Sequence, residues 1–345
     1  MGDFRTDTRT LRRVSLAAAT TALFAAAVVV TTVPPGSDAA GVPIVAFSAP
    51  APAPTLGQPW RYAPAWQQFV PHVSFPDAGE LRDFFNAIEF DLAGVRAGTR
   101  MVPRVFLASL PEDYHRIEAV TARKRTFLRV VLPLVLRVNE ELRADRARLA
   151  TIVARAHAGT PPPPEEAAWA LTLSARYGVE PGDWAELMRR VDTVSPALAL
   201  AQAAEESGWA TSRFAREGNA VFGQWSWRAG SGLVPVRRSD GASHEVRSFE
   251  TLLDSVRAYA TNLNTHPSYE RFRAARAALR AEGRPLDATA LAATLDAYSE
   301  RGDEYIETLH AILRANRLQQ FEDAQLAPPE PATAASHHLM ARNDG

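Results

Sequence analysis

Apolar residues recur at helical spacing along most of the chain beyond residue 60. Pro133 falls inside the longest such pattern, at 115–157. It is expected to kink that helix or split it in two, because proline lacks a backbone donor and crowds the preceding turn. The apolar positions of this pattern are Ile117, Val120, Phe127, Leu128, Val131, Leu134, Val135, Val138, Leu142, Leu149 and Ile152.

Shorter stretches of the same periodicity predict a mostly helical protein. A turn-forming stretch at 74–77 opens a helix that runs toward Phe90. A short apolar run at 101–111 suits a strand or an extended packing segment. The other predicted helices cover 165–177, 180–190, 196–207, 250–264, 269–281, 288–298 and 303–316.

The pattern changes between residues 230 and 249. Two glycines, at 230 and 232, precede a stretch in which Leu233, Val234 and Val236 come before the Asp-Gly pair at 240–241. Val246 and Phe249 follow that pair. Apolar residues on both sides of an Asp-Gly turn are typical of a β-hairpin. The fold class predicted from the whole chain is therefore mainly α, with a small β element (α+β).

The helix predicted at 196–207 has clear signals at both ends. Ser195 suits the N-cap, and Pro196 suits the first helical position, where a backbone donor would be unsatisfied anyway. Ser207 and Gly208 are expected to end the helix. Leu198, Ala201, Gln202 and Glu205 share one of its faces.

Two acidic residues, Glu205 and Glu206, stand in the last turn of this helix. The negative end of the helix dipole disfavours a carboxylate there, and the neighbouring Trp209 could add desolvation. A carboxyl group that keeps its proton near neutral pH is what a general acid for glycosidic cleavage requires. A solvated pair of surface acids at a frayed helix end is the alternative that spacing alone leaves open.

Residues 201–215 (AQAAEESGWATSRFA) and 219–225 (NAVFGQW) resemble the glucosaminidase domain of bacterial peptidoglycan hydrolases, glycoside hydrolase family 73, and most of all its Bax-type branch. A weaker resemblance extends over 195–316, and Ala210 replaces the usual glycine after the tryptophan. The resemblance implies a lysozyme-like domain with a helical lobe and a small β-hairpin lobe. It implies that Glu206 is the catalytic acid, and that Asn219, Phe222 and Gly223 shape the substrate groove.

The resemblance also implies a second acidic residue in the hairpin and a tyrosine near the scissile bond. The family's usual position for that acid, near 236–238, carries none in this chain. Asp240 is explained by turn chemistry, so Glu245 is the candidate base, with an exposed strand carboxylate as the alternative. Tyr298 matches the family's tyrosine, with a solvent-facing aromatic as its alternative, and Tyr305 matches more as a packing position.

The reaction implied is hydrolysis of β-1,4 bonds next to N-acetylglucosamine in peptidoglycan glycan strands, by an endo-β-N-acetylglucosaminidase. If Glu245 lies too far away to activate water, the substrate's own 2-acetamido group could act as the nucleophile. Sugar rings are expected on Trp209, Phe222, Trp225 and Trp227, with hydrogen bonds from Asn219 and Gln224. No cofactor is expected. A lytic transglycosylase or muramidase on the same fold, or a non-catalytic glycan-binding protein, stays open.

Composition narrows the classes of function. A formal net charge of −1 gives no case for nucleic acid or an anionic membrane surface. Without cysteine, disulfides, thiolate nucleophiles and cysteine-ligated metals are excluded. His72, His115 and His157 are isolated and the pair at 337–338 lacks further ligands, so no metal site is expected. We expect a monomer.

Five regions follow from these patterns. Residues 1–40 combine four arginines with an apolar run at 14–33 and small residues near Ala39, which predicts a signal peptide. The apolar run is also just long enough to cross a bilayer, so a retained single-span inner-membrane anchor is the alternative. Either predicts an exported protein of the periplasm or cell envelope. An Ala/Pro linker at 41–58, a helical region at 59–192, the glucosaminidase domain at 193–320 and a disordered tail at 321–345 follow.

Overall fold

A computed structural model describes residues 72–226, 230, 232–234 and 245–329 of the 345-residue chain. The predicted targeting segment at 1–40, the linker at 41–58, the Asp-Gly turn at 240–241 and Trp227 lie outside these residues. Within the described part of the chain, no helix combines the length and apolarity needed to cross a membrane.

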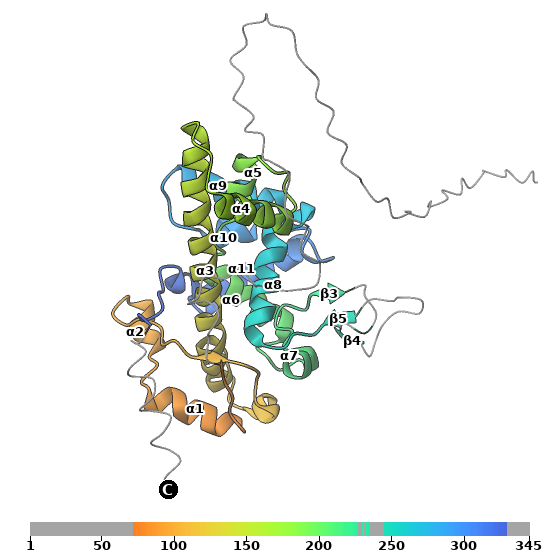
Figure 1. Cartoon of the computed structure of the whole chain (residues 1–345). Coiled ribbons are helices and arrows are strands. Elements are labelled where there is room, and N and C mark those ends of the chain that lie inside the picture. The colour runs from red at the N-terminus through yellow and green to blue at the C-terminus, as the bar shows by residue number, and fades with distance from the viewer. Residues whose placement is uncertain (1–71, 227–229, 231, 235–244, 330–345) are drawn as a thin grey trace, which may run out of the picture. The chain divides into compact units, whose positions relative to one another are not determined.

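The protein is mainly helical, with two small sheets, as the periodicity predicts (Figure 1). Most predicted helices are confirmed within a few residues. The 74–77 stretch provides Asp77 as N-cap of the first helix, where its side chain accepts a hydrogen bond from the Glu80 N–H. The helices are α1 (Ala78–Ala87), α2 (Leu92–Arg96), α3 (Val120–His157), α4 (Pro164–Tyr177), α5 (Trp184–Arg190), α6 (Pro196–Ser207), α7 (Arg213–Gly218), α8 (Leu252–Thr265), α9 (Glu270–Ala281), α10 (Ala288–Ala292) and α11 (Asp303–Ala315), with 3-10 turns η2 (Glu112–Arg116), η3 (Pro267–Tyr269) and η4 (Leu318–Phe321).

The long helix α3 runs unbroken through Pro133, so the predicted split is wrong (Figure 1). Proline inside a helix costs about 3 kcal/mol. Here the neighbours on both sides, 130–132 and 134–136, are buried, and this burial offsets the lost hydrogen bond. The helix also begins later than predicted, because 112–116 forms the separate turn η2. Val120 is consequently 53% exposed, although the periodicity placed it in the core.

Helix α6 lies at the centre of the fold, packed against α3, α10, α11 and η4. Its residues from Pro196 to Ala204 are all buried, and most of them are alanine or leucine. Alanine side chains allow neighbouring helices to approach on several sides at once. The predicted caps are confirmed: the Leu198 N–H donates to Ser195 Oγ, and Gly208 ends the helix in the left-handed conformation.

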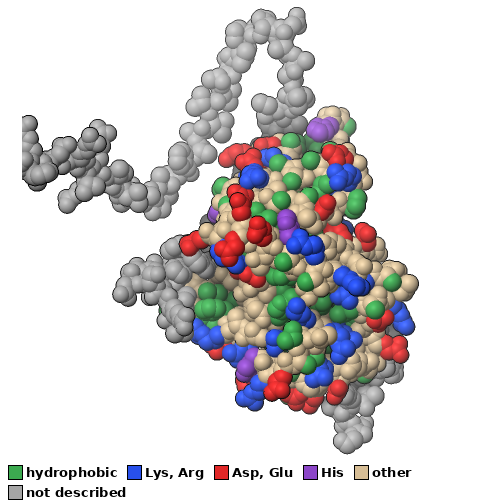
Figure 2. All heavy atoms as spheres, turned by 180° about the vertical axis from the view of Figure 1, so that it is seen from behind, with side chains coloured by type: hydrophobic (Ala, Val, Ile, Leu, Met, Phe, Trp, Pro, Cys, Tyr) green, Lys and Arg blue, Asp and Glu red, His purple; other side chains and the backbone are tan. Residues whose placement is uncertain are grey.

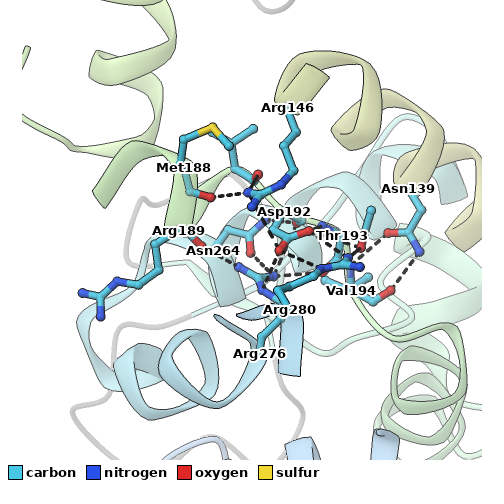
Figure 3. A network of polar contacts seen from close by, with 11 residues as sticks. Asn139, Arg146, Met188, Arg189, Asp192, Thr193, Val194, Asn264, Arg276 and Arg280 are labelled. Carbon is cyan, nitrogen blue, oxygen red and sulfur yellow. Dashed lines mark hydrogen bonds and ion pairs between the residues drawn. The ribbon is translucent and has the colours of Figure 1, made fainter. Parts of the chain in front are cut away.

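A network of polar contacts fixes the segment that leads into α6 (Figure 3). The Asp192 carboxylate lies 3.0 Å from Arg280 and 3.8 Å from Arg276, which is fully buried. Arg276 also donates to the Thr193 carbonyl and to Asn264 Oδ1. Residues of α5, α8 and α9 therefore hold the start of α6 through its preceding backbone.

The β elements are short. Strands β1 (His72–Val73) and β2 (Phe106–Leu107) pair in parallel, which confirms a strand within 101–111. Strands β3 (Trp225–Ser226), β4 (Gly232–Leu233) and β5 (Glu245–Arg247) form an antiparallel sheet in the order β3-β5-β4. The pairing of Leu233 with Val246 confirms the two sides of the predicted hairpin. Figure 1 shows this sheet beside α7 and α8.

Two predictions near the C-terminus need correction. The helix expected at 288–298 ends at Ala292, and turns carry the chain to Tyr298. Disorder was predicted from residue 321, but Phe321 is fully buried and Leu326 bridges to Val102 across the fold. Phe321 and Leu326 belong to the hydrophobic core, which the polar composition of the segment did not indicate. On the face shown in Figure 2, acidic and basic side chains are interspersed.

Candidate active site

The candidate site is built on the last turn of α6. Both acids lie there, as predicted, but they point to different partners. Glu205 accepts a hydrogen bond of 2.6 Å from the Arg301 guanidinium, and its side chain is 25% exposed. Glu206 instead lies partly buried beside the tyrosines of α8 and α11. The carboxyl of Glu206 is therefore in a different environment from that of its neighbour.

A row of hydrogen bonds leads to the Glu206 carboxyl. The Tyr259 hydroxyl donates to Gln202 Oε1 at 2.7 Å, and Gln202 Nε2 donates to the Tyr305 hydroxyl at 3.0 Å. The Tyr305 hydroxyl then donates to Glu206 Oε1 at 2.8 Å. Gln202, Tyr259 and Tyr305 are each at most 1% exposed. Three elements, α6, α8 and α11, thus meet at one carboxyl group.

Burial raises the pKa of Glu206 above its ordinary value. The hydrogen bond from Tyr305 acts in the opposite direction, the nearby Glu205 adds to the increase, and Arg301 reduces it. The direction agrees with the sequence-based expectation. The cause differs, because burial among aromatic side chains is the largest contribution, and the Trp209 ring lies elsewhere.

Gly223 lies directly against Glu206. A Cβ atom at this position would be 3.6 Å from Glu206 Oε2. Its φ of +58° is also a left-handed conformation that other residues adopt at a cost. The motif glycine therefore lets the loop after α7 approach the carboxyl without a side chain between them.

Three residues predicted to line the groove make contacts with other parts of the protein. The Phe222 ring is 2% exposed and stacks on Tyr259 with 3.9 Å between ring centroids, so it forms the wall behind the site and no sugar can stack on it in this conformation. The Trp209 ring packs edge-on against Phe127, with Lys124 Nζ 4.5 Å from its centroid. Asn219 donates to the Phe249 and Glu250 carbonyls.

Tyr298 lies close to the site. Its ring stacks on Tyr305 at 5.6 Å between centroids and also contacts the Tyr269 ring at 5.7 Å. Burial, together with the neighbouring Tyr305 and Glu206, raises the pKa of Tyr298 well above its ordinary value, so its hydroxyl keeps its proton. The structure thus brings Tyr298, Gly223 and Glu206 together.

Glu245 lies in β5, opposite Ser226 of β3. It is 8% exposed, and its carboxylate accepts hydrogen bonds from the Gly230 and Gly232 N–H groups at 3.0 and 2.9 Å. These bonds hold the chain that enters β4. The alternative of an exposed strand carboxylate is therefore wrong. Trp225 lies in β3, and the Gln224 carbonyl accepts a hydrogen bond from the Arg247 N–H, which fixes the start of the sheet.

Sequence reasoning missed the partners of Glu206. Tyr305 was expected to pack, and neither Gln202 nor Tyr259 was a candidate. One signal was present, since Gln202 precedes Glu206 by four residues and so lies one helical turn away on the same face. Nothing in the sequence pattern placed α8 and α11 on either side of that turn.

In the described parts of the chain, no group of three or more acidic or histidine side chains is arranged to hold a metal ion.

Comparisons with known proteins identify a domain that includes these residues. The glucosaminidase family model, described as mannosyl-glycoprotein endo-beta-N-acetylglucosaminidase, matches residues 182–318. The match covers α6 with Glu206, the small sheet and α11 with Tyr305. No solved structure matches the chain. The fold and the family match therefore define a mainly helical, lysozyme-like glucosaminidase domain.

The relationship extends beyond that domain. The chain is 34% identical over 216 residues to Protein bax of Escherichia coli (strain K12). The matched region covers 61% of this chain and 75% of the relative. The chain thus belongs to the Bax-type proteins with a glucosaminidase domain.

Proposed function

We propose that this protein is a peptidoglycan hydrolase, an endo-β-N-acetylglucosaminidase in which Glu206 is the general acid. The observation that carries the proposal is the placement of Glu206, partly buried at the end of α6, beside Gly223 and with its pKa raised by burial. A carboxyl group in such a site keeps the proton that glycosidic cleavage consumes. Membership of a glucosaminidase family supports the same reaction.

In the proposed reaction, Glu206 donates its proton to the oxygen that links two sugars. The bond between that oxygen and the anomeric carbon breaks, and the bonding electrons stay with the leaving oxygen. Positive charge develops on the sugar ring as in an oxocarbenium ion. The ionised Glu206 is then ready to accept a proton from the incoming water, which restores the enzyme.

Two groups can complete the reaction. Glu245 could activate water as a base, but its carboxylate would have to give up or share a bond to Gly230 or Gly232. The substrate's 2-acetamido oxygen could instead attack the anomeric carbon, with Tyr298 positioning it. The two bonds that fix Glu245 support the second route, in which Glu245 holds the β-lobe in shape.

The predicted targeting segment supports action in the cell envelope, where the glycan substrate lies. We propose that the protein is exported, and that 1–40 either is cleaved or remains as an anchor. N-terminal sequencing of the protein recovered from the envelope fraction distinguishes these: a terminus near residue 41 indicates cleavage, and an intact terminus indicates an anchor.

The test is digestion of purified peptidoglycan by wild type and by Glu206→Gln, with masses of the released fragments. Wild type is expected to release glycan chains with reducing N-acetylglucosamine ends, and Glu206→Gln to be about 10²–10⁴-fold slower because it has no proton to donate. Glu205→Gln is the matched control. It loses the ion pair with Arg301 and the charge that adds to the pKa of Glu206, but it keeps the Glu206 carboxyl, and it is expected to stay within about tenfold of wild type.

Three outcomes would contradict the proposal. Undiminished hydrolysis by Glu206→Gln would show that Glu206 is not the general acid. Anhydro-muramic ends would identify a lytic transglycosylase, and reducing muramic ends a muramidase. Binding of glycan without turnover by wild type would identify a glycan-binding protein.

A further inference from the structure

The hydrogen bonds that reach Glu206 all run in one direction. Tyr259 donates to the amide oxygen of Gln202, which leaves the Gln202 amide nitrogen to donate to Tyr305. Because the Tyr305 oxygen accepts that bond, its own proton is directed to Glu206 Oε1. Each member thus fixes the donor of the next.

The two oxygens of the Glu206 carboxyl have different surroundings as a result. Oε1 accepts the proton of Tyr305 at 2.8 Å. Oε2 lies on the side of Gly223, where a Cβ would be 3.6 Å away. In a protonated carboxyl group the carbonyl oxygen is a better hydrogen-bond acceptor than the hydroxyl oxygen, so a fixed donor to one oxygen favours the proton on the other.

We propose that Tyr305 is a positioning residue that holds Oε1 of Glu206 as an acceptor, so that Oε2, on the Gly223 side, carries the proton for the sugar bridge. This inference rests on the proposed function of Glu206 and adds which oxygen acts and what selects it. Tyr305 itself does not react. Gln202 and Tyr259 orient its hydroxyl.

Tyr305 is suited to remain a donor. Burial and the nearby Glu206 raise the pKa of its hydroxyl far above its ordinary value, so it stays protonated wherever the enzyme works. Its ring is held in place by stacking on Tyr298 at 5.6 Å. The charged or titratable groups that influence Glu206 from the surrounding elements are Glu205 of α6, Arg301, Tyr298, Tyr259, Tyr269 and Tyr305.

The first test needs no substrate. Infrared spectra recorded against pH, with the spectrum of Glu206→Gln subtracted, isolate the Glu206 carboxyl in the full-length protein. If the proton is on Oε2, then Oε1 is the carbonyl oxygen and feels the hydrogen bond from Tyr305. The C=O stretch of the protonated acid is therefore expected to move to higher wavenumber in Tyr305→Phe, and the midpoint of titration to rise by about one pH unit.

An unmoved C=O stretch in Tyr305→Phe would overturn the assignment, because it would place the proton on Oε1 or the tyrosine elsewhere. Tyr259→Phe is expected to move both quantities in the same direction by less, since Gln202 stays in place. Tyr177→Phe is the matched control. It removes the hydroxyl of another buried tyrosine, 1% exposed in α4, and is expected to move neither.

The second test uses peptidoglycan turnover. Tyr305→Phe is expected to lower kcat about tenfold with KM within twofold. The alkaline limb of the pH profile of kcat/KM is expected to move upward by the same amount as the infrared midpoint. Unchanged kcat with an unmoved limb would overturn the proposal. If wild type shows no turnover, the proposed function fails, while the infrared result still decides the role of Tyr305.

Discussion

Asp192 and Glu206 are acidic residues near opposite ends of one helix, and their surroundings have opposite effects. Burial raises the pKa of Asp192, but Arg276, Arg280 and Arg146 outweigh burial and bring it below its ordinary value (Figure 3). Burial raises the pKa of Glu206, and the single hydrogen bond from Tyr305 does not reverse it. Arginines thus stabilise the ionised form of Asp192, whereas burial beside tyrosines favours the protonated form of Glu206.

The difference shows that burial alone does not decide the direction in which the pKa of an acid moves. Asp192 is more buried than Glu206, yet its charge is compensated by neighbours that also bind the backbone around it. Such an acid holds structure together. Glu206 accepts its hydrogen bond from a tyrosine hydroxyl, and the nearby Arg301 is bonded to Glu205.

The largest effect is expected at the arginine cluster. Asp192→Asn should lower the free energy of unfolding by about 3 kcal/mol at pH 7, because it leaves Arg276 buried without its counter-charge. The pKa of Asp192 in the folded protein lies below its ordinary value of 3.8. The stabilisation by ionised Asp192 is therefore present above that pH and is lost in acid. Urea denaturation at pH 7 and at pH 3 should show the gap between wild type and variant closing.

The control for that variant is Asp296→Asn. Asp296 is 45% exposed and pairs with Arg271 at 2.8 Å, so its loss should cost less than about 1 kcal/mol. Equal losses at Asp192 and Asp296 would mean that the buried arginines do not depend on Asp192.

A third acid extends the comparison. Glu322 accepts a hydrogen bond of 2.7 Å from Ser195 at the start of α6, and burial raises its pKa to about 7. The folded protein favours the neutral form of the Glu322 carboxyl. The stability that this form contributes is fully present below 4.5, the pKa of the unfolded state, and is lost as pH rises through about 7. Glu322→Gln should therefore be up to about 3 kcal/mol more stable than wild type at pH 8, and about equal to it at pH 4.

Thermal unfolding across this pH range measures the effect. Glu282→Gln, which changes an exposed acid paired with Arg284, is the control and should change the free energy of unfolding by less than about 1 kcal/mol. A Glu322→Gln variant that is equally stable at both pH values would show that the carboxyl ionises without penalty.

The loop beside Glu206 is the next place to test. Gly223→Ala puts a methyl group 3.6 Å from Oε2 and forces alanine into a left-handed conformation. We expect a stability loss of about 1–2 kcal/mol and about a tenfold lower kcat/KM on peptidoglycan. Gly178→Ala imposes the same strain at the end of α4, where φ is +62°, and should lower stability without lowering kcat/KM. Parallel losses of activity in the two variants would attribute the effect to strain alone.

The smallest effect is expected at the ion pair between Arg301 and Glu205. Arg301 reduces the pKa of Glu206, so Arg301→Gln should move the alkaline limb of the activity profile upward by a few tenths of a pH unit. The shift should shrink at high salt, because Arg301 is 39% exposed. A downward shift, or one that salt does not change, would contradict this account.

Much of the local structure was predictable from the sequence. Ser195, Pro196 and Gly208 mark the ends of α6 by their own conformational preferences, which depend on no distant residue. The same holds for Asp77 before α1. The prediction failed where distant packing overruled a local preference, as at Pro133 inside α3 and at Phe321 in the supposed tail.

For the site, the sequence supplied the acid and the glycine that stands beside it, because one motif carries both. It also favoured Tyr298. It could not show that Phe222 would be covered by Tyr259 or that Trp209 would turn toward Phe127, since an aromatic residue suits a sugar platform and a core equally well.

The sequence by itself thus determined where helix α6 begins and ends and that two acids share its last turn. Only the tertiary structure decided which of them could keep a proton. The pKa of a carboxyl depends on groups within a few ångströms, and those around Glu206 come from residues 259, 298 and 305, up to about a hundred positions away in the chain. Packing of α8 and α11 against α6 brings them there, and no local pattern encodes that packing.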